Sequence, residues 1–156
     1  MNRRLRAMQY ERYVLCLASV DYRHSMGGLG RYLRGEMELL GSVQVSSICL
    51  FPFPTKRSKR LDRYLSKYWG VIVDGKLAGF YGAHEILSIL AELGRAGRQL
   101  IETQLHHVKH FNLTRVAELL AAAPFGVKLF LHDYYTICPG AHLLRNGKQY
   151  CGAAMP

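Results

Sequence analysis

The stretch "YVLCLASVDYRHSMGGLGRYLRGEMELLGSVQVSSICLF" covers residues 13–51 and decides the fold. It opens with an unbroken apolar run over 13–20, which has the length of a strand, and continues into a glycine-rich turn. Four apolar residues then recur at helical spacing: Leu29, Leu33, Met37 and Leu40. Gly41 supplies a stop, and a second β-rich run fills 43–51. This order predicts a βαβ unit whose first strand is buried on both faces.

The rest of the chain repeats the alternation of strands and helices. The predicted elements are a hairpin over 71–80, a helix over 83–97, a strand over 99–107, a helix over 113–123 and a buried strand over 127–133. Asp74-Gly75 is the expected hairpin turn, and Asn112 is the expected N-cap of the last helix. We therefore predict an α/β fold: a Rossmann-like, doubly wound parallel sheet with helices on both faces. Residues 1–156 are long enough for one such domain.

The net charge of +10 is concentrated in the N-terminal part of the chain. Residues 1–67 hold 13 Lys and Arg against 5 Asp and Glu, and many of the basic residues fall in the loop-like stretch 52–69. Such a distribution favours an anionic partner, namely nucleic acid, a phosphorylated small molecule or an acidic membrane surface. A solvated basic face that aids solubility would have the same composition.

Cysteine usage and the lack of long apolar segments favour a cytoplasmic protein. Cys16 and Cys49 lie within apolar runs and are expected to be buried, and the chain contains no CxxC motif. Cys138, His142 and Cys151 have the spacing C-x3-H-x8-C, which lacks a fourth ligand and matches no standard zinc pattern. We therefore predict no metal site.

Polar residues follow three of the predicted strands, where an open α/β sheet binds its ligands. The glycine turn around Gly28 and Gly30 follows the first strand, His106-His107 ends the strand over 99–107, and His132 lies near the end of the last strand. Glycines at the start of a helix suit a phosphate, although they also serve simply to turn the chain. An imidazole at a strand end suits a sugar hydroxyl or a phosphate, although structural histidines are common. A dinucleotide is disfavoured because Leu33 replaces the third glycine of the G-x-G-x-x-G turn.

Two stretches of this sequence resemble the N-terminal half of family-4 glycosyltransferases. "VDYRHSMGGLGRYLRGEMELLG" resembles their first loop and helix, with a glycine pair, a small spacer, an arginine and an amphipathic helix that ends in glycine. Residues 100–152 resemble their succession of a strand ending in histidines, a helix, a Pro-Gly break and a strand ending "HDYY…CP…L…G.YCG". Together the two stretches cover about half of the chain, and residues 52–82 match nothing in that family.

The resemblance implies one half of a GT-B enzyme that transfers a sugar with retention of anomeric configuration. It implies that Gly28 and Gly30 face the donor phosphates, that His132 is a catalytic residue at the reaction centre, and that His106 contacts the acceptor. The expected partners are a nucleotide-sugar donor, a sugar, polysaccharide or lipid-linked acceptor, and a C-terminal GT-B domain that grips the donor. Beyond the nucleotide sugar as co-substrate, no cofactor is expected. Without that second domain the chain is expected to be inactive.

The alternative interpretation is a stand-alone basic α/β module that binds nucleic acid or another polyanion without catalysis. The stretch "KRSKRLDRYLSKYW" mixes basic and aromatic residues, as phosphate-binding and stacking surfaces do. The same basic residues are compatible with peripheral contact between a transferase and the anionic inner face of a membrane.

Overall fold

A computed structural model of the chain describes residues 8–53, 67–122, 126–132, 144–145 and 149–150. The main sheet is built from strands β1 (Arg12–Leu17), β2 (Ser46–Pro52), β3 (Tyr68–Val73), β4 (Lys76–Gly82), β5 (Gln99–Leu105) and β6 (Val127–Leu129). Its helices are α1 (Gly28–Ser42), α3 (Ala83–Arg95) and α4 (Leu113–Ala121). A separate two-stranded ribbon pairs β7 (Leu144–Arg145) with β8 (Gln149–Tyr150). The predicted α/β class and the order of the predicted elements are confirmed.

The sheet has the strand order β4-β3-β2-β1-β5-β6. β1 pairs in parallel with both β2 and β5, and β5 pairs in parallel with β6, so the chain passes from β1 to β2 through α1 and from β5 to β6 through α4. The expectation of a wholly parallel sheet is wrong, because β3 runs antiparallel to both of its neighbours. The tight hairpin turn after β3 leaves no room for a crossover helix, so β3 and β4 are antiparallel.

The hairpin turn between β3 and β4 confirms the predicted role of Asp74-Gly75. Both residues have positive φ, 45° at Asp74 and 78° at Gly75, as the two central residues of a type I′ turn require. The Asp74 carboxylate also fixes the turn to the rest of the sheet. It accepts hydrogen bonds from the Ser47 amide at 2.8 Å, the Ser46 hydroxyl at 3.0 Å and the Gln9 amide at 3.0 Å.

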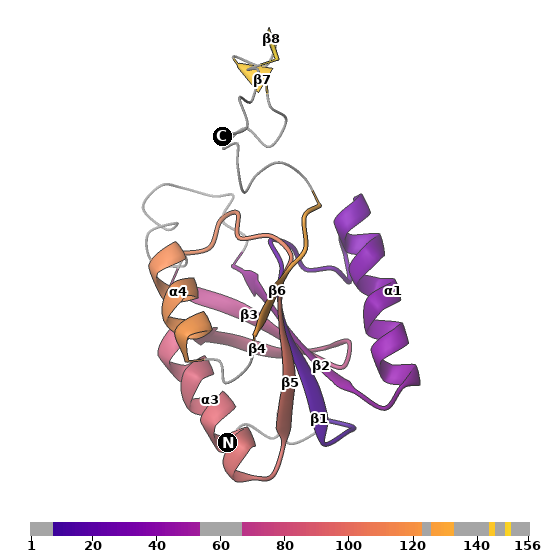
Figure 1. Cartoon of the computed structure of the whole chain (residues 1–156), viewed down its shortest axis with the longest axis vertical. Coiled ribbons are helices and arrows are strands. Elements are labelled where there is room, and N and C mark those ends of the chain that lie inside the picture. The colour runs from indigo at the N-terminus through magenta and orange to yellow at the C-terminus, as the bar shows by residue number, and fades with distance from the viewer. Residues whose placement is uncertain (1–7, 54–66, 123–125, 133–143, 146–148, 151–156) are drawn as a thin grey trace.

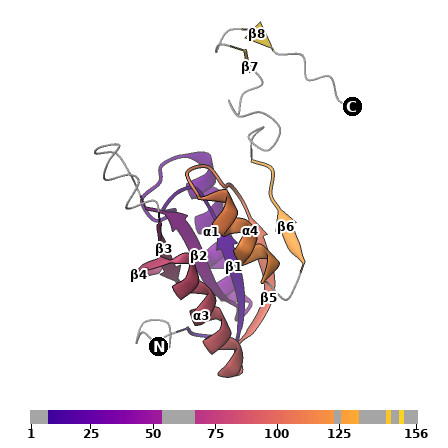
Figure 2. The same cartoon turned by 90° about the vertical axis from the view of Figure 1, so that its left-hand side faces the viewer.

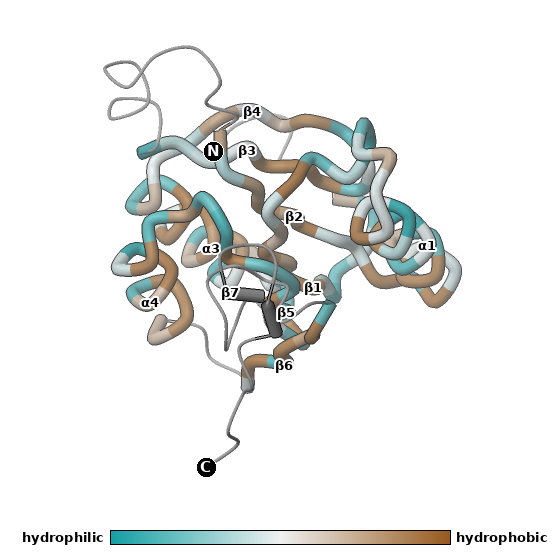
Figure 3. The backbone as a smooth tube through the Cα atoms, turned by 90° about the horizontal axis from the view of Figure 1, so that it is seen from above, coloured by the Kyte–Doolittle hydropathy of each residue, from teal (hydrophilic) through white to brown (hydrophobic). Residues whose placement is uncertain are grey.

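Helices cover both faces of the sheet. Figure 1 shows α1 on one side and α3 and α4 on the other, and Figure 2, turned by 90°, places α3 and α4 in front of the strands and α1 behind them. Figure 3 gives the same arrangement from above, with the strands between the two helical layers. The predicted covering of both faces is confirmed.

Two hydrophobic clusters form the core, one on each face, because successive side chains of a strand point to opposite faces. On the face of α3 and α4, Leu15 and Leu50 pack with Ile86, Leu93 and other buried residues. On the α1 face the cluster is smaller and consists of Cys16, Ala18, Tyr22, Leu33, Cys49, Phe51 and Ile72. β1 is buried from Tyr13 to Leu17, as its apolar sequence predicts.

The last strand of the sheet differs from its prediction. The apolar run over 127–133 was expected to form a buried strand, but β6 spans Val127–Leu129 at the edge of the sheet and all three of its residues are exposed. Leu129 and Leu131 are 53% and 69% exposed. None of the helices in the described residues is long and apolar enough to cross a lipid bilayer.

Candidate functional site at the carboxyl edge of the sheet

The glycine turn leads from β1 into the first turn of α1. Gly27 is an extended N-cap without a side-chain hydrogen bond, and the first intrahelical bond runs from the Arg31 amide to the Gly27 carbonyl. The amides of Gly28, Leu29 and Gly30 therefore have no acceptor within the helix. The helix dipole adds partial positive charge at this end, which suits an anion.

The two predicted glycines of this turn have different surroundings. Gly28 is exposed, and a Cβ atom added there would meet nothing within 4 Å. Gly30 is buried against the preceding loop, and a Cβ atom there would lie 2.6 Å from Ser25 Cβ and 2.7 Å from the Ser25 carbonyl oxygen. Arg34 fastens the same loop, since its Nη1 donates to the carbonyls of Tyr22 and Ser25 at 2.6 and 2.8 Å. The absence of a side chain at Gly30 thus allows the loop to pack on the helix.

The second predicted residue, His106, lies directly after β5 and is 3% exposed. Its Nδ1 lies 2.9 Å from Nε2 of His132, which follows β6. The planes of the two imidazoles differ by 17°, so the hydrogen bond joins them nearly edge to edge. The structure thus brings together two histidines that lie 26 residues apart in the sequence. His107, by contrast, is half-buried and its Nδ1 accepts a hydrogen bond from the Lys109 amide.

Aromatic rings surround the histidine pair. Phe130 stacks on His106 with ring centroids 4.3 Å apart. Tyr32, from the second turn of α1, places its ring 5.1 Å from that of His132 in an edge-on arrangement and 5.8 Å from that of His106. Tyr32 therefore connects the helix that starts at the glycine turn with the two histidines.

A row of polar side chains on β5 and β6 extends from the histidine pair along the α1 face. Nε2 of His106 lies 3.1 Å from Oε1 of Gln104 and 3.4 Å from Oε2 of Glu36 on α1. Nε2 of Gln104 donates to Oε1 of Glu102 at 2.7 Å, and the other carboxylate oxygen of Glu102 pairs with Lys128. Gln104 is only 4% exposed. We call Glu36, Glu102, Gln104, His106, Lys128 and His132 the histidine network.

The electrostatics of the histidine network fix the charges of its members. Burial, together with the neighbouring His132, lowers the pKa of His106 to about 4, against a smaller opposing effect of Glu102. His106 is therefore neutral at physiological pH. Burial would raise the pKa of Glu102, but hydrogen bonds from Lys128 and Gln104 hold it below its ordinary value, so this carboxylate is ionised. Burial raises the pKa of Glu36, although an interaction with Gln104 opposes the increase.

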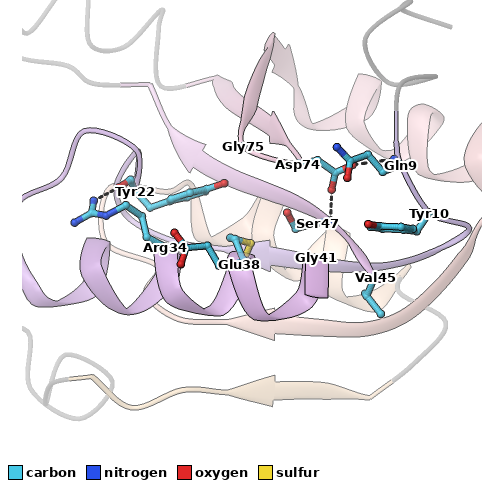
Figure 4. Close-up of a pocket in the computed structure, with 11 residues that line it drawn as sticks. Gln9, Tyr10, Tyr22, Arg34, Glu38, Gly41, Val45, Ser47, Asp74 and Gly75 are labelled. Carbon is cyan, nitrogen blue, oxygen red and sulfur yellow. Dashed lines mark hydrogen bonds between the residues drawn. The ribbon is translucent and has the colours of Figure 1, made fainter. Parts of the chain in front are cut away.

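One pocket lies at the carboxyl edge of the sheet, and another runs along α1. One, of about 430 Å³, opens between the beginnings of α3 and α4 and is lined by Lys67, Tyr68, His84 and Arg115 among others. The other, of about 270 Å³, follows α1 toward the hairpin turn, and Figure 4 shows Tyr22, Arg34, Glu38 and Asp74 around it. The Tyr22 hydroxyl is buried and has no hydrogen-bond partner among the described residues. Burial raises its pKa well above the ordinary value, which keeps it protonated.

The cysteines provide no nucleophile in the described residues. The thiols of Cys16 and Cys49 face each other across β1 and β2, with sulfur atoms 3.7 Å apart, and both residues are fully buried as predicted. The hydrogen bond to Cys49 and complete burial raise the pKa of Cys16 well above its ordinary value. No three His, Cys, Asp or Glu side chains in the described parts of the chain are grouped so that they could hold a metal ion.

Several predicted features lie outside the described residues. They are the core of the basic stretch 52–69, the turn at Asn146-Gly147, and Cys138, His142 and Cys151 of the weak metal pattern. The roles predicted for Gly28, Gly30, His106 and His132 stay predictions, although the first turn of α1 and both histidines lie at the same edge. Sequence reasoning missed Glu36, Glu102 and Gln104. The signal available for Glu102 and Gln104 was that they precede His106 in steps of two residues along one strand.

Comparisons with known proteins identify no relative of this chain. No protein-family model matches it, and neither the curated proteins nor the solved structures contain a match.

Proposed function

We propose that this chain is the acceptor-side half of a retaining glycosyltransferase that uses a nucleotide sugar. The proposal starts from the resemblance of its two sequence stretches to family-4 glycosyltransferases. The observation that carries it furthest is the contact between the two strand-end histidines, with Nδ1 of His106 2.9 Å from Nε2 of His132. The resemblance assigns His132 to the reaction centre and His106 to an acceptor contact.

In this proposal the reaction takes place over the carboxyl edge of β1, β5 and β6. The amides of the first turn of α1 face the diphosphate of the donor, where negative charge develops as the sugar leaves. Hydrogen-bond donors placed at that position lower the activation barrier of sugar transfer without a metal ion. His132, which is exposed, contacts the reacting sugars. Because His106 is buried, we replace the direct acceptor contact expected from the resemblance with a role that acts through His132.

The acceptor and the second domain complete the proposed enzyme. The pocket of about 430 Å³ between α3 and α4 gives an acceptor room at the same edge, beside the cationic side chains of Lys67 and Arg115. An acceptor that carries phosphate, such as a lipid-linked sugar, suits that charge. The net charge of +10 also favours peripheral contact with an anionic membrane. A C-terminal domain would hold the nucleotide.

The test is a transfer assay with the protein produced from the complete reading frame. It is incubated with membranes and with each of a panel of UDP- and GDP-sugars, and the release of nucleoside diphosphate is measured together with the labelled product. We expect transfer from at least one donor, and a fall of about 100-fold or more for His132→Ala because a group at the reaction centre is lost. The matched control is His107→Ala, which is expected to keep most of the activity. A protein that uses no donor, or a His132→Ala variant as active as the wild type, would contradict the proposal.

A further inference from the structure

The hydrogen bonds of the histidine network have only one consistent direction. Both oxygens of the ionised Glu102 accept, one from Lys128 and one from Gln104. The amide nitrogen of Gln104 must therefore face Glu102, and its oxygen Oε1 must face His106. Nε2 of His106 then has two acceptors around it, Gln104 Oε1 at 3.1 Å and Glu36 Oε2 at 3.4 Å.

This arrangement determines which nitrogen of each imidazole carries a proton. Because the described part of the chain places only acceptors at Nε2 of His106, this must be the protonated nitrogen. His106 is neutral and buried, so its Nδ1 has a lone pair and accepts the hydrogen bond of 2.9 Å from His132. Nε2 of His132 therefore carries a proton, and in the neutral ring Nδ1 is the unprotonated nitrogen.

We propose that Glu36, Gln104 and His106 are positioning residues that fix His132 as the Nε2-protonated tautomer with its ring held in one orientation. The arrangement parallels the way a carboxylate or carbonyl selects the tautomer of a histidine at catalytic and metal sites. In this tautomer Nδ1 is the ring nitrogen of His132 that carries the lone pair, and Nε2 donates to His106.

The packing around the two imidazoles fixes the orientation of the rings, in addition to the tautomer that the hydrogen bonds select. Phe130 stacks on His106 at 4.3 Å, and Tyr32 places its ring edge-on to His132 at 5.1 Å. Within the described residues, the buried Oε2 of Glu36 makes no standard hydrogen bond and lies 3.4 Å from Nε2 of His106. It therefore provides a second acceptor for the same proton.

The inference rests on the proposed function only where it assigns His132 to sugar transfer; the tautomer itself is independent of that function. The test is therefore spectroscopic and uses the chain itself, labelled with 15N on histidine. Long-range proton–nitrogen spectra at neutral pH identify the protonated nitrogens, and scalar coupling across the hydrogen bond identifies donor and acceptor. His106→Asn and His132→Asn variants assign the signals. We expect the proton on His132 Nε2 to show coupling to Nδ1 of His106.

The role of the positioning residues is tested with a set of variants. Gln104→Met combined with Glu36→Leu removes both acceptors for the His106 proton, and we expect at least a two-fold loss of the coupling as His106 populates its other tautomer. Glu36→Gln keeps an acceptor oxygen on both side chains and is expected to keep the coupling, which also covers the case in which the double variant fails to fold. Thr103→Val is the matched control, because Thr103 is equally buried but on the opposite face of β5.

Three results would overturn the inference. They are a proton on His106 Nδ1 in the wild-type chain, the absence of coupling between the two rings, or unchanged coupling in a folded double variant. Each of these outcomes is distinguishable from failure of the transferase proposal, because the spectra need neither donor nor acceptor. If the coupling is found but no nucleotide sugar is ever used, the tautomer assignment stands and the proposed function fails.

Discussion

The buried, neutral His106 predicts a specific dependence of stability on pH. Its pKa is about 4 in the folded chain and 6.5 in an ordinary histidine, so the unfolded chain binds more protons at this position between those values. The contribution to stability is therefore fully present above about pH 6.5, is lost as the pH falls toward 4, and is constant below. The charged and titratable groups that face His106 are His132, Glu102 and Glu36, with Tyr32 beside the ring, and Lys128 pairs with Glu102 behind them.

The magnitude follows from the two pKa values. Each unit of difference corresponds to about 1.4 kcal/mol, so between pH 7 and pH 4.5 His106 alone should remove about 2–3 kcal/mol from the free energy of unfolding. His106→Asn eliminates this titration while leaving a side-chain oxygen near the position of Nδ1, where it can still accept from His132. The variant is expected to be less stable at pH 7 but to lose about 2–3 kcal/mol less than the wild type on acidification.

Urea denaturation at pH 7 and pH 4.5 measures both free energies. Trp69 is the only tryptophan, is 1% exposed and packs against Phe111, so its emission reports unfolding. Because all other titrating groups are shared, the comparison of the two chains isolates His106. Equal losses of stability in wild type and His106→Asn would refute the assignment of a buried neutral imidazole.

Other substitutions test the parts of the fold that position the site. Gly30→Ala should lower the free energy of unfolding by about 1–3 kcal/mol because its Cβ would meet Ser25. Gly28→Ala should change that free energy by less than about 0.5 kcal/mol, because a Cβ there meets nothing. Equal effects of the two substitutions in urea denaturation would contradict this packing. Asp74→Ala should cost about 2–3 kcal/mol because it removes three hydrogen bonds, and Asp74→Asn, which keeps an acceptor, should cost clearly less in the same assay. Leu33 is 0% exposed, so Leu33→Ala should lower the free energy of unfolding by about 2–5 kcal/mol. Leu39 is 64% exposed, so Leu39→Ala should change it very little. A lower melting temperature for Leu39→Ala than for Leu33→Ala would show that α1 packs through another face.

Most elements of the fold could be predicted because their local signals agree with their tertiary environment. The apolar run of β1, the helical spacing of Leu29, Leu33 and Met37, and the Asp74-Gly75 turn each have one physical interpretation. Asn112 is also the N-cap that the sequence predicts, since its side chain accepts from the Arg115 amide. The predicted ends of the elements were less accurate. The strand predicted over 99–107 ends at Leu105, and the helix predicted over 83–97 ends at Arg95.

The exposed edge strand could not be predicted from hydropathy. Val127, Leu129 and Leu131 form an apolar run that is typical of a buried strand, yet β6 has a paired neighbour on one side only. Sequence pattern reports the apolar character of a segment and not its place in the strand order. That place is set by long-range pairing, which a single sequence does not display.

The histidine network could not be predicted for a related reason. Simple alternation along β5 would put Glu102, Gln104 and His106 on the same face as Leu100, in the core beside α3 and α4. The register against β1 instead skips Ile101, with Tyr13 paired to Leu100 and Val14 paired to Glu102. This β-bulge reverses the alternation and turns the three polar side chains toward α1. The carboxyl-edge location of both histidines was predictable, but their direct contact was not.

The measurement that tests the central claim most directly is the anomeric configuration of the transferred sugar. The complete protein is incubated with an α-linked nucleotide sugar that it uses and with an acceptor, and the anomeric proton of the new glycoside is followed by NMR from the start of the reaction. A retaining transferase built around His132 predicts an α-linked product from the α-linked donor. A β-linked product, or release of free sugar without any glycoside, would contradict it.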